Sequence, residues 1–317
     1  MSNRPAAPRS ERRMLVIFPG ALGDLICAGP AIRALGRINP DVAVDLMARA
    51  ELADFAAGRM GVERGYSIDR REVSALFGAG DANDPAARKF FGQFHGIISF
   101  FAYDDAGYRR ALSDACAGPV TFHQFRPSGE GHIAELYLRS IGAPQEPLEA
   151  RIDFTEADLV AGDETMAAKN LIPGEFLIIF PGSGGAKKNW SEKRFARLTL
   201  EIEDRMRLRP LAVLGPAEED LGPLFHDFRI ATVSRLPLAT VAALAKLAAG
   251  FVGNDSGVSH LAAAAGAHGV VIFGPTDPAR WRPLGPVTVV RATDLEAITV
   301  EQVIRALEDT LRSIDPA

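Results

Sequence analysis

The chain has 317 residues, of which 47% are hydrophobic and 24% are charged, and its formal net charge is -5. This is the composition of a globular protein, and it argues against a disordered or fibrous chain. The length predicts two domains, since single cores seldom grow past about 250 residues, and the negative charge argues against binding nucleic acid over the whole surface.

The N-terminus carries four arginines before the apolar run M-L-V-I-F-P-G-A-L, as a secretory signal would. Pro19, Gly20 and Asp24 interrupt that run too early for a signal, so we assign the run to a first β-strand and residues 1–12 to a disordered basic tail. No segment reaches the ~20 apolar residues that span a bilayer. The two cysteines lack C-x-x-C spacing, which favours a reducing compartment. We therefore expect a cytoplasmic protein, soluble or at most peripheral to a membrane.

A strand, a glycine-containing loop and a helix open the first domain. The helix is indicated by apolar residues at i, i+3, i+7 and i+10, namely Leu25, Ala28, Ile32 and Leu35. A strand with alternating apolar residues follows, at Val42, Val44 and Leu46. Residues 97–101 are predicted as a further strand and residues 132–141 as a helix. Strands alternating with helices in this way predict a mostly parallel sheet.

The segment G-A-P-Q-E-P at 142–147 breaks this pattern of strands and helices. We therefore place the first domain at 13–150 and a linker, which contains a helix near 156–170, at 151–173. A second domain then extends over 174–298.

The second domain repeats the start of the first. L-V-I-F-P-G-A-L-G-D begins at Leu15, and L-I-I-F-P-G-S-G-G-A begins at Leu177. A helix with Phe195, Leu198 and Ile202 on one face follows, and then a strand over 211–214. The fold class is therefore predicted as α/β, with two Rossmann-like doubly wound parallel sheets whose ligands bind beyond the carboxyl ends of the strands.

Residues 251–281 contain the most informative motif. They read as an apolar strand, a turn of small polar residues ending in Ser256 and Gly257, an alanine-rich helix and a second strand over 270–273. The turn places Asp255, Ser256 and Gly257 at a helix N-terminus. Unpaired N–H groups and the helix dipole favour a bound phosphate or sugar hydroxyl at such a position.

The run N-D-S-G-V-S-H-L-A-A-A, followed by F-G-P-T-D-P-A-R-W, resembles the signature of glycosyltransferase family 9, the ADP-heptose:lipopolysaccharide heptosyltransferases. The resemblance implies a GT-B fold, in which two Rossmann-like domains face a cleft. It implies that ADP-heptose binds in the C-terminal domain and a lipopolysaccharide-core or related saccharide against the N-terminal domain. It further implies a cytoplasmic enzyme, at most peripheral at the inner membrane, and a C-terminal helix at 299–317 that packs back on the N-terminal domain.

Asp24 has two interpretations. It follows the first strand and precedes a helix, where a lone Asp is commonly the N-cap. Leu22, Gly23 and Asp24 also match the family's L-G-D, whose aspartate the resemblance implies to be the general base that takes the acceptor's proton.

The loop P-G-S-G-G-A-K-K-N-W, from Pro181 to Trp190, is neither a Walker A loop nor a G-x-G-x-x-G loop. The residues alone also fit a solvated lysine pair, Lys187 and Lys188. The resemblance implies that Lys188, two residues before the Trp, reaches the donor diphosphate and stabilises the leaving nucleotide. It implies neighbouring backbone contacts at Ser183 and Gly184.

The remaining donor contacts are also implied by the resemblance. Glu218 matches a ribose-binding glutamate, although Glu219 or Asp220 could serve and a first-turn acid would complement a helix dipole. Four further residues match contacts with the donor sugar and phosphates: Asp255, Ser256, Gly257 and His260, and Val258 is assigned to the same donor site. Val258 departs from the Pro or Leu that is common at its position, and a lone His is more often structural.

The absence of a D-x-D motif and of zinc-ligand spacing predicts a reaction without metal or cofactor. Phe18-Pro19-Gly20 departs from the family pattern before L-G-D, which bears on the acceptor. Arginines of the first domain would suit a phosphorylated lipid-core acceptor, or a solvated surface: Arg59, Arg64, Arg70, Arg71, Arg109, Arg110 and Arg126. The alternatives are a nucleotide-sugar epimerase or hydrolase of the same architecture, and a non-catalytic sugar-nucleotide-binding protein, against which Asp24 in its L-G-D context argues.

Overall fold

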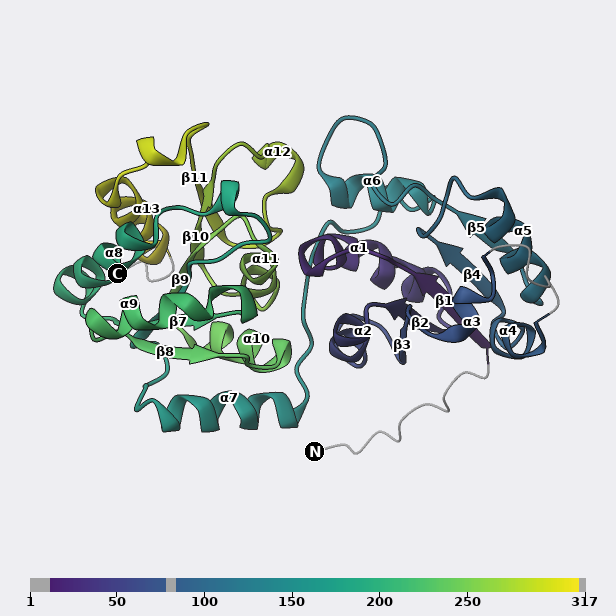
Figure 1. Ribbon diagram of the computed structural model, residues 1–317, viewed down its shortest axis with the longest axis horizontal. Helices are drawn as coiled ribbons and strands as arrows, with labels where there is room; N and C mark the ends of the chain where they lie inside the picture. Colours follow the sequence, from purple (N-terminus) through teal and green to yellow (C-terminus); the bar gives the residue numbers. More distant parts are fainter. Residues whose placement is uncertain (1–11, 78–83, 314–317) are drawn as a thin grey trace. The chain divides into compact units, whose positions relative to one another are not determined.

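The computed structural model describes residues 12–77 and 84–313 (Figure 1). Most of the predicted tail, residues 1–11, lies outside the described residues, and Arg12 is already part of a strand. The chain forms two compact units. Of the described residues, the first comprises 12–20, 30–77, 84–129 and 136–147, and the second comprises 21–29, 130–135 and 148–313.

The first unit is built on a five-stranded parallel sheet in the order β3-β2-β1-β4-β5. Its strands are β1 (Arg12–Ile17), β2 (Val42–Ala48), β3 (Gly65–Ser67), β4 (Gly96–Ser99) and β5 (Val120–Phe122). The apolar run at the N-terminus is the central strand, because β1 pairs in parallel with both β2 and β4. The chain order reverses between β1 and β4, so this is the topological switch point of the first sheet.

Helices connect these strands as the alternating pattern predicted. They are α1 (Leu22–Ile38), α2 (Ala50–Ala56), α3 (Arg71–Ser74), α4 (Pro85–Phe91), α5 (Ala106–Ala115) and α6 (Ile133–Ser140). Phe91, Phe94 and Tyr108 are fully buried in the core between α4, α5 and the sheet. The guanidinium of Arg13 makes a buried ion pair with Asp45, with Nε 2.7 Å from Oδ2.

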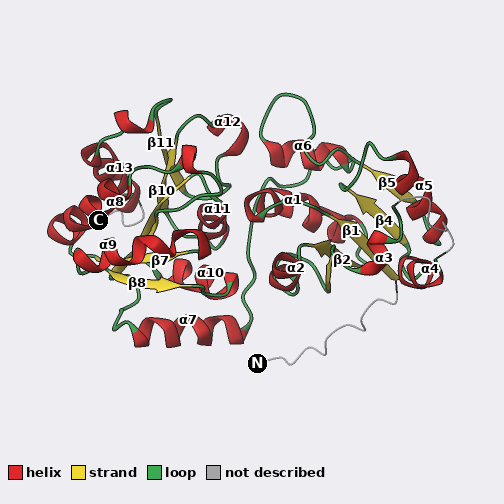
Figure 2. Cartoon of the chain, in the orientation of Figure 1, coloured by secondary structure: helices red, strands yellow, loops and turns green. Residues whose placement is uncertain are grey.

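The second unit contains a six-stranded parallel sheet in the order β11-β10-β9-β6-β7-β8, and helices lie around its strands (Figure 2). The strands are β6 (Phe176–Phe180), β7 (Arg209–Leu214), β8 (Ala231–Ser234), β9 (Gly250–Asn254), β10 (Gly269–Phe273) and β11 (Val287–Arg291). The repeated motif again supplies a central strand, because β6 pairs with β7 and β9. The switch point of this sheet therefore lies between β6 and β9.

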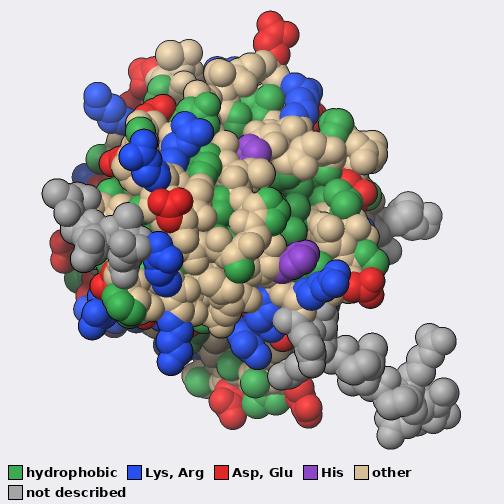
Figure 3. Space-filling view, turned by 90° about the vertical axis from the view of Figure 1, so that its right-hand side faces the viewer, with side chains coloured by type: hydrophobic (Ala, Val, Ile, Leu, Met, Phe, Trp, Pro, Cys, Tyr) green, Lys and Arg blue, Asp and Glu red, His purple; other side chains and the backbone are tan. Residues whose placement is uncertain are grey.

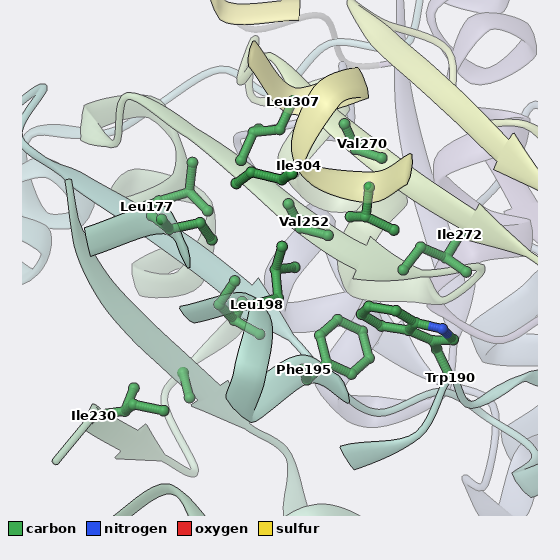
Figure 4. Close-up of a cluster of buried hydrophobic side chains, with 14 of the residues drawn as sticks. Leu177, Trp190, Phe195, Leu198, Ile230, Val252, Val270, Ile272, Ile304 and Leu307 are labelled. Carbon is green, nitrogen blue, oxygen red and sulfur yellow. The ribbon is translucent and has the colours of Figure 1, made fainter. Parts of the chain in front are cut away.

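The helices of the second unit include the predicted helix after the domain boundary and the final helix. They are α7 (Glu156–Ala168), α8 (Glu192–Met206), α9 (Gly222–Asp227), α10 (Leu238–Leu247), α11 (Gly257–Ala264), α12 (Pro278–Trp281) and α13 (Val300–Arg312), with the short 3₁₀ helices η1 (Ala186–Lys188), η2 (Pro216–Leu221) and η3 (Leu295–Ala297). Figure 4 shows the core that they build, in which Trp190, Phe195, Leu198 and Val252 lie beneath Ile304 and Leu307 of α13.

Helices α13 and α7 both pack within the second unit. Helix α13 was expected to pack back on the first domain, but it packs on α8, β10 and β11 of the second unit. The reason is its strongly amphipathic face, whose Val303, Ile304 and Leu307 are fully buried in the second core. Helix α7, which the sequence predicts within the linker, packs on α10. No helix among the described residues has the length and hydropathy that crossing a membrane requires.

Candidate functional site

The loop after β6 is open and rich in glycine. Ser183 Oγ lies 2.6 Å from Asn189 Oδ1 and accepts a hydrogen bond from the N–H of Gly185 at 3.3 Å, so the serine shapes the turn. A Cβ atom added at Gly184 or Gly185 would meet no heavy atom within 4 Å. The exposed backbone of this loop can therefore approach a ligand closely.

Lys188, at the end of this loop, is held by Asp255 at the end of β9. Its Nζ donates to Asp255 Oδ2 at 2.7 Å, and the lysine side chain is 38% exposed whereas the carboxylate is 6% exposed. The pair joins the loops on either side of the switch point. Lys188 is therefore an ion-pair partner of Asp255 that solvent still reaches, whereas Lys187 beside it is exposed.

Asn254 was not predicted as a site residue, although it is the first residue of the N-D-S-G motif. Its buried side chain accepts the N–H of Trp190 at Oδ1 (3.0 Å) and donates from Nδ2 to the carbonyl of Pro181 (2.7 Å). These two residues begin and end the loop. Asn254 therefore holds both ends of the loop that carries Lys188.

Helix α11 begins at the same edge of the sheet. Ser256 is its N-cap, with Oγ accepting the N–H of Ser259 at 3.4 Å, and Ser259 Oγ donates to the carbonyl of Asn254 at 2.7 Å. Gly257 and Val258 form the first turn and are half-buried. Such a turn directs N–H groups without helical partners, and the positive end of the dipole, at a bound anion.

Asp24 lies in the first turn of α1. The first two turns of this helix belong to the second unit. The helix begins at Leu22, two residues before the aspartate, so Asp24 is not the N-cap residue. Its Oδ2 instead accepts the N–H of Ala21 at 3.3 Å, the bond that an acidic third residue makes in a capping box. Asp24 is 8% exposed and thus held in a fixed place.

A buried pair, Cys27 and His260, lies beside this aspartate within the second unit. Cys27 Sγ is 3.5 Å from His260 Nδ1. Burial, and then the negative charges of Asp24 and Asp255, raise the pKa of the Cys27 thiol, so both carboxylates are close enough to act on it. Burial lowers the pKa of His260 to about 4, which leaves the ring neutral at pH 7. Cys27 was missed, although it lies one turn after Asp24.

The first turns of α1 and α11 approach each other through two glycines. A Cβ at Gly257 would lie 2.9 Å from Leu22 Cβ and 3.1 Å from the Gly23 nitrogen, and a Cβ at Gly23 would lie 3.4 Å from His260 Cδ2. Only glycine at position 257 permits this spacing. The approach brings Asp24 to the side of the N-D-S-G turn.

Glu218 is the acid that faces the loop after β6. Its Oε2 accepts the N–H of Gly215 at 3.0 Å, and a Cβ added at Gly182 would overlap its carboxyl group. Burial raises the pKa of Glu218. Glu219, one of the two alternatives, forms an exposed ion pair with Arg235, whereas Glu218 is the acid whose carboxyl group lies against Gly182.

Two of the arginines predicted for the first domain bond to its own backbone and side chains. Arg59 donates to the carbonyls of Phe55 and Ala57, and Arg70 pairs with Glu72, whose pKa it lowers to about 2. Figure 3 shows Lys and Arg side chains at several separate places on the face that it draws. Among residues 12–77 and 84–313, no three His, Cys, Asp or Glu side chains are grouped as metal ligands would be.

Comparison with known proteins places this arrangement in a family. Residues 132–305 match the model of glycosyltransferase family 9 (heptosyltransferase). The chain is 24% identical over 287 residues to lipopolysaccharide heptosyltransferase 1 of Escherichia coli K12, with 84% of this chain and 89% of the relative covered.

Two solved structures illustrate the likeness of the fold. A glycosyltransferase family 9 protein from Veillonella parvula superposes with a TM-score of 0.78 at 18% identity, covering 96% of this chain and 98% of that one. Escherichia coli heptosyltransferase WaaC with ADP superposes with a TM-score of 0.68 at 21% identity, covering 94% and 99%. The fold is therefore the expected GT-B fold. Because the family model matches more than half of the sequence, the chain belongs to glycosyltransferase family 9, the heptosyltransferases, and is a glycosyltransferase.

Proposed function

We propose that the protein transfers heptose from ADP-heptose to a hydroxyl of a lipopolysaccharide-core or related saccharide, with inversion at the anomeric carbon. The observation that carries this proposal is the pairing of Lys188 with Asp255 across the switch point, next to the first turn of α11. A cation and a helix N-terminus at that place are suited to a nucleotide diphosphate. The family membership and the ADP in the similar WaaC structure support the choice of nucleotide.

The diphosphate binds between the loop after β6 and α11. Lys188 exchanges its partner, from the Asp255 carboxylate to the donor phosphates, while the backbone at Ser183 and Gly184 and the first turn at 256–258 donate N–H groups. Because negative charge grows on ADP as its bond to the sugar breaks, the ammonium stabilises the transition state more than the ground state.

The nucleoside and the sugar have separate partners. Glu218, which lies over Gly182, accepts hydrogen bonds from the ribose hydroxyls. Once Lys188 has moved to the phosphates, Asp255 accepts hydrogen bonds from hydroxyls of the heptose. His260, buried against Cys27, supports the turn that carries Asp255. A neutral His260 adds no charge that would compete with Lys188 for the phosphates.

Asp24 acts as the general base. Its carboxylate takes the proton of the acceptor hydroxyl, and the oxygen attacks the anomeric carbon from the face opposite ADP. The bond between that carbon and the phosphate oxygen breaks, and ADP leaves with the electron pair. A positioned base of this kind contributes about 10² to 10⁴ in rate, and the bond from Ala21 fixes Asp24 for it.

We assign the acceptor to the first unit and the reaction to the cytoplasm. A lipid-linked acceptor would bring the enzyme into peripheral contact with the inner leaflet. No metal or cofactor is part of this mechanism, because Lys188 and α11 supply the positive charge at the diphosphate.

Incubation of the purified protein with ADP-heptose, with and without a lipopolysaccharide-core acceptor, tests this proposal. Sugar transfer that requires the acceptor is expected. Epimerised or hydrolysed donor without acceptor would support the alternative of an epimerase or hydrolase. Intact donor in both reactions, despite measurable ADP binding, would support a sugar-nucleotide-binding protein without catalysis.

A further inference from the structure

Cys27 in α1 is a buried thiol whose proton the proposed mechanism does not use. The residue is 1% exposed, and its Sγ lies 3.5 Å from Nδ1 of His260, which is 4% exposed. His260 is fixed in turn by α11, where its backbone N–H donates to the carbonyl of Ser256 at 3.2 Å. Both members of the pair belong to the second unit. Their helices therefore hold the thiol against one particular nitrogen of the ring.

The direction of the hydrogen bond between Cys27 and His260 follows from the protons available. Burial raises the pKa of the Cys27 thiol and lowers the pKa of His260 to about 4, so at pH 7 the pair is a thiol and a neutral ring. Nδ1 is the only hydrogen-bond partner of Sγ in the part of the chain that the structure describes. If Nδ1 carried the proton, the S–H would be buried without an acceptor, which costs free energy. The S–H group therefore donates to Nδ1.

This bond decides which nitrogen of His260 can act as a donor. A neutral imidazole carries one proton, so a ring that accepts at Nδ1 has its N–H at Nε2. The Nε2 side of the ring faces the first turn of α1, since a Cβ added at Gly23 would lie 3.8 Å from Nε2 and 3.5 Å from the Cα of Gly257. Nε2 makes no hydrogen bond with the described residues. It is therefore a fixed donor that is available to a ligand at the first turn of α11.

We infer that Cys27 is a positioning residue, whose thiol holds His260 as the Nε2–H tautomer so that this N–H donates to an oxygen of the bound sugar nucleotide. Sugar hydroxyls and phosphate oxygens are both suitable acceptors. The inference rests on the proposed function for the identity of the ligand, but the tautomer itself can be measured on the protein without ligand.

NMR of the full chain with 15N-labelled histidine tests the tautomer, because the chemical shifts of the two ring nitrogens show which one carries the proton. The signals of His260 are assigned by their absence from His260→Asn. At pH 7 the parent should carry the proton on Nε2. Cys27→Ala should add a share of the Nδ1–H form, because Nδ1 has lost its donor, and Cys27→Ser, which keeps a hydroxyl donor, should restore the parental signals. A proton on Nδ1 in the parent, or an unchanged tautomer in Cys27→Ala, would overturn the inference.

Cys116→Ala is the matched control, because Cys116 is the other cysteine of the chain. Its Sγ donates to the carbonyl of Phe94 at 3.6 Å within the first unit. The substitution should leave the signals of His260 unchanged. A change as large as the one in Cys27→Ala would mean that these signals respond to the loss of either thiol, and it would overturn the inference. Melting temperatures show that the variants are folded.

Calorimetry with ADP and with ADP-heptose shows whether Cys27 acts through His260. Cys27→Ala should weaken binding about twofold to tenfold, the contribution of a neutral hydrogen bond, and Cys27→Ser should restore the affinity. A loss already seen with ADP assigns the bond to a phosphate, and a loss seen only with ADP-heptose assigns it to the sugar. In a His260→Asn background the loss should vanish, since no ring remains to be positioned. Unchanged affinity in Cys27→Ala, or an equal loss in that background, would overturn the positioning role.

The two measurements separate this inference from the proposed function. An Nε2–H tautomer that depends on Cys27, in a protein that binds neither ADP nor ADP-heptose, would keep the positioning by Cys27 and overturn the proposed function. Transfer from ADP-heptose by a protein whose His260 carries its proton on Nδ1 would keep the proposed function and overturn the inference.

Discussion

The loops after β1 and β6 begin with the same pattern of an apolar strand followed by glycine. They differ in the charged side chain that they carry, an aspartate or a lysine, and in how deeply that side chain is buried. After β1 the chain enters α1 at once, and Asp24 in the first turn is 8% exposed with its carboxylate bonded to the backbone. After β6 an open glycine loop precedes α8, and Lys188 remains 38% exposed. A base must be fixed before the reaction begins, whereas a phosphate-binding cation must be able to change partners. The difference in burial suits the roles that the proposed mechanism gives to Asp24 and Lys188.

The largest effect is expected from Asp24→Asn, which tests the fixed loop. The amide keeps an oxygen for the N–H of Ala21, so melting temperature and ADP affinity should stay near those of the parent. The amide cannot take a proton, so the transfer rate should fall by about 10² or more. All three are measured on one preparation. Transfer at the parental rate would leave Asp24 only its structural bond at the helix start.

The next largest effect concerns the pH dependence of stability and comes from His260, which lies against Cys27 of α1. The pKa of His260 is about 4 in the folded chain and 6.5 ordinarily, so the unfolded chain binds more protons between these values. The free energy of unfolding is therefore highest above pH 6.5. It falls by on the order of 3 kcal/mol as the pH is lowered towards 4. Urea unfolding across this range measures it.

The control for this pH effect is His260→Asn, which removes the titrating ring. Burial also lowers the pKa values of His123 and His132, so some dependence of the same sign should remain in the variant. The dependence in the parent should be clearly steeper. Equal pH dependence in parent and variant would show that His260 does not titrate as described.

Lys188→Ala tests the exposed loop. Donor affinity should fall by roughly 1.5 to 3 kcal/mol, the range for hydrogen bonds to charged groups. Lys187→Ala is the matched control, since Lys187 precedes it in η1 and is exposed. Calorimetry with ADP compares the two variants. Equal losses would mean that the loop attracts the donor by its charge alone, and parental affinity in Lys188→Ala would remove its phosphate role.

Gly182→Ala should have a smaller effect, on the contact between the exposed loop and Glu218. The added methyl group would overlap the Glu218 carboxyl group and displace this flexible side chain. The chain should remain folded, and ADP affinity should fall by about 0.5 to 1.5 kcal/mol, the worth of one hydrogen bond. Gly185→Ala, whose methyl group would meet nothing within 4 Å, is the control. Unchanged affinity for both variants would argue against Glu218 as the ribose partner.

Removal of metal should have the smallest effect. Because a lysine and a helix N-terminus stabilise the diphosphate in the proposed mechanism, the transfer rate should be the same in excess EDTA. The transfer assay with and without chelator measures this. Loss of activity in EDTA that added magnesium or manganese restores would contradict the mechanism.

The sequence predicted the strands and loops of this site well, because apolar runs that end in glycine mark buried parallel strands and their carboxyl ends. It could not predict partners that lie far apart in the chain. The approach of Cys27 to His260 joins residues separated by 233 positions. The amphipathic face of α13 indicated burial but not which sheet would cover it, so only the resemblance suggested a place; in the structure this face packs on the second sheet.

Asn254 makes the loop from Pro181 to Trp190 a closed ring, since one side chain fastens its first and last residues. The chain loses the entropy of closing this loop when the sheet folds. Ligand binding therefore does not have to pay that loop-closure entropy again. Residues inside the ring can then be exchanged without moving its anchors. The part of the loop that binds the diphosphate in the proposed mechanism can therefore be varied at positions 183–189 as one cassette, with Asn254 kept.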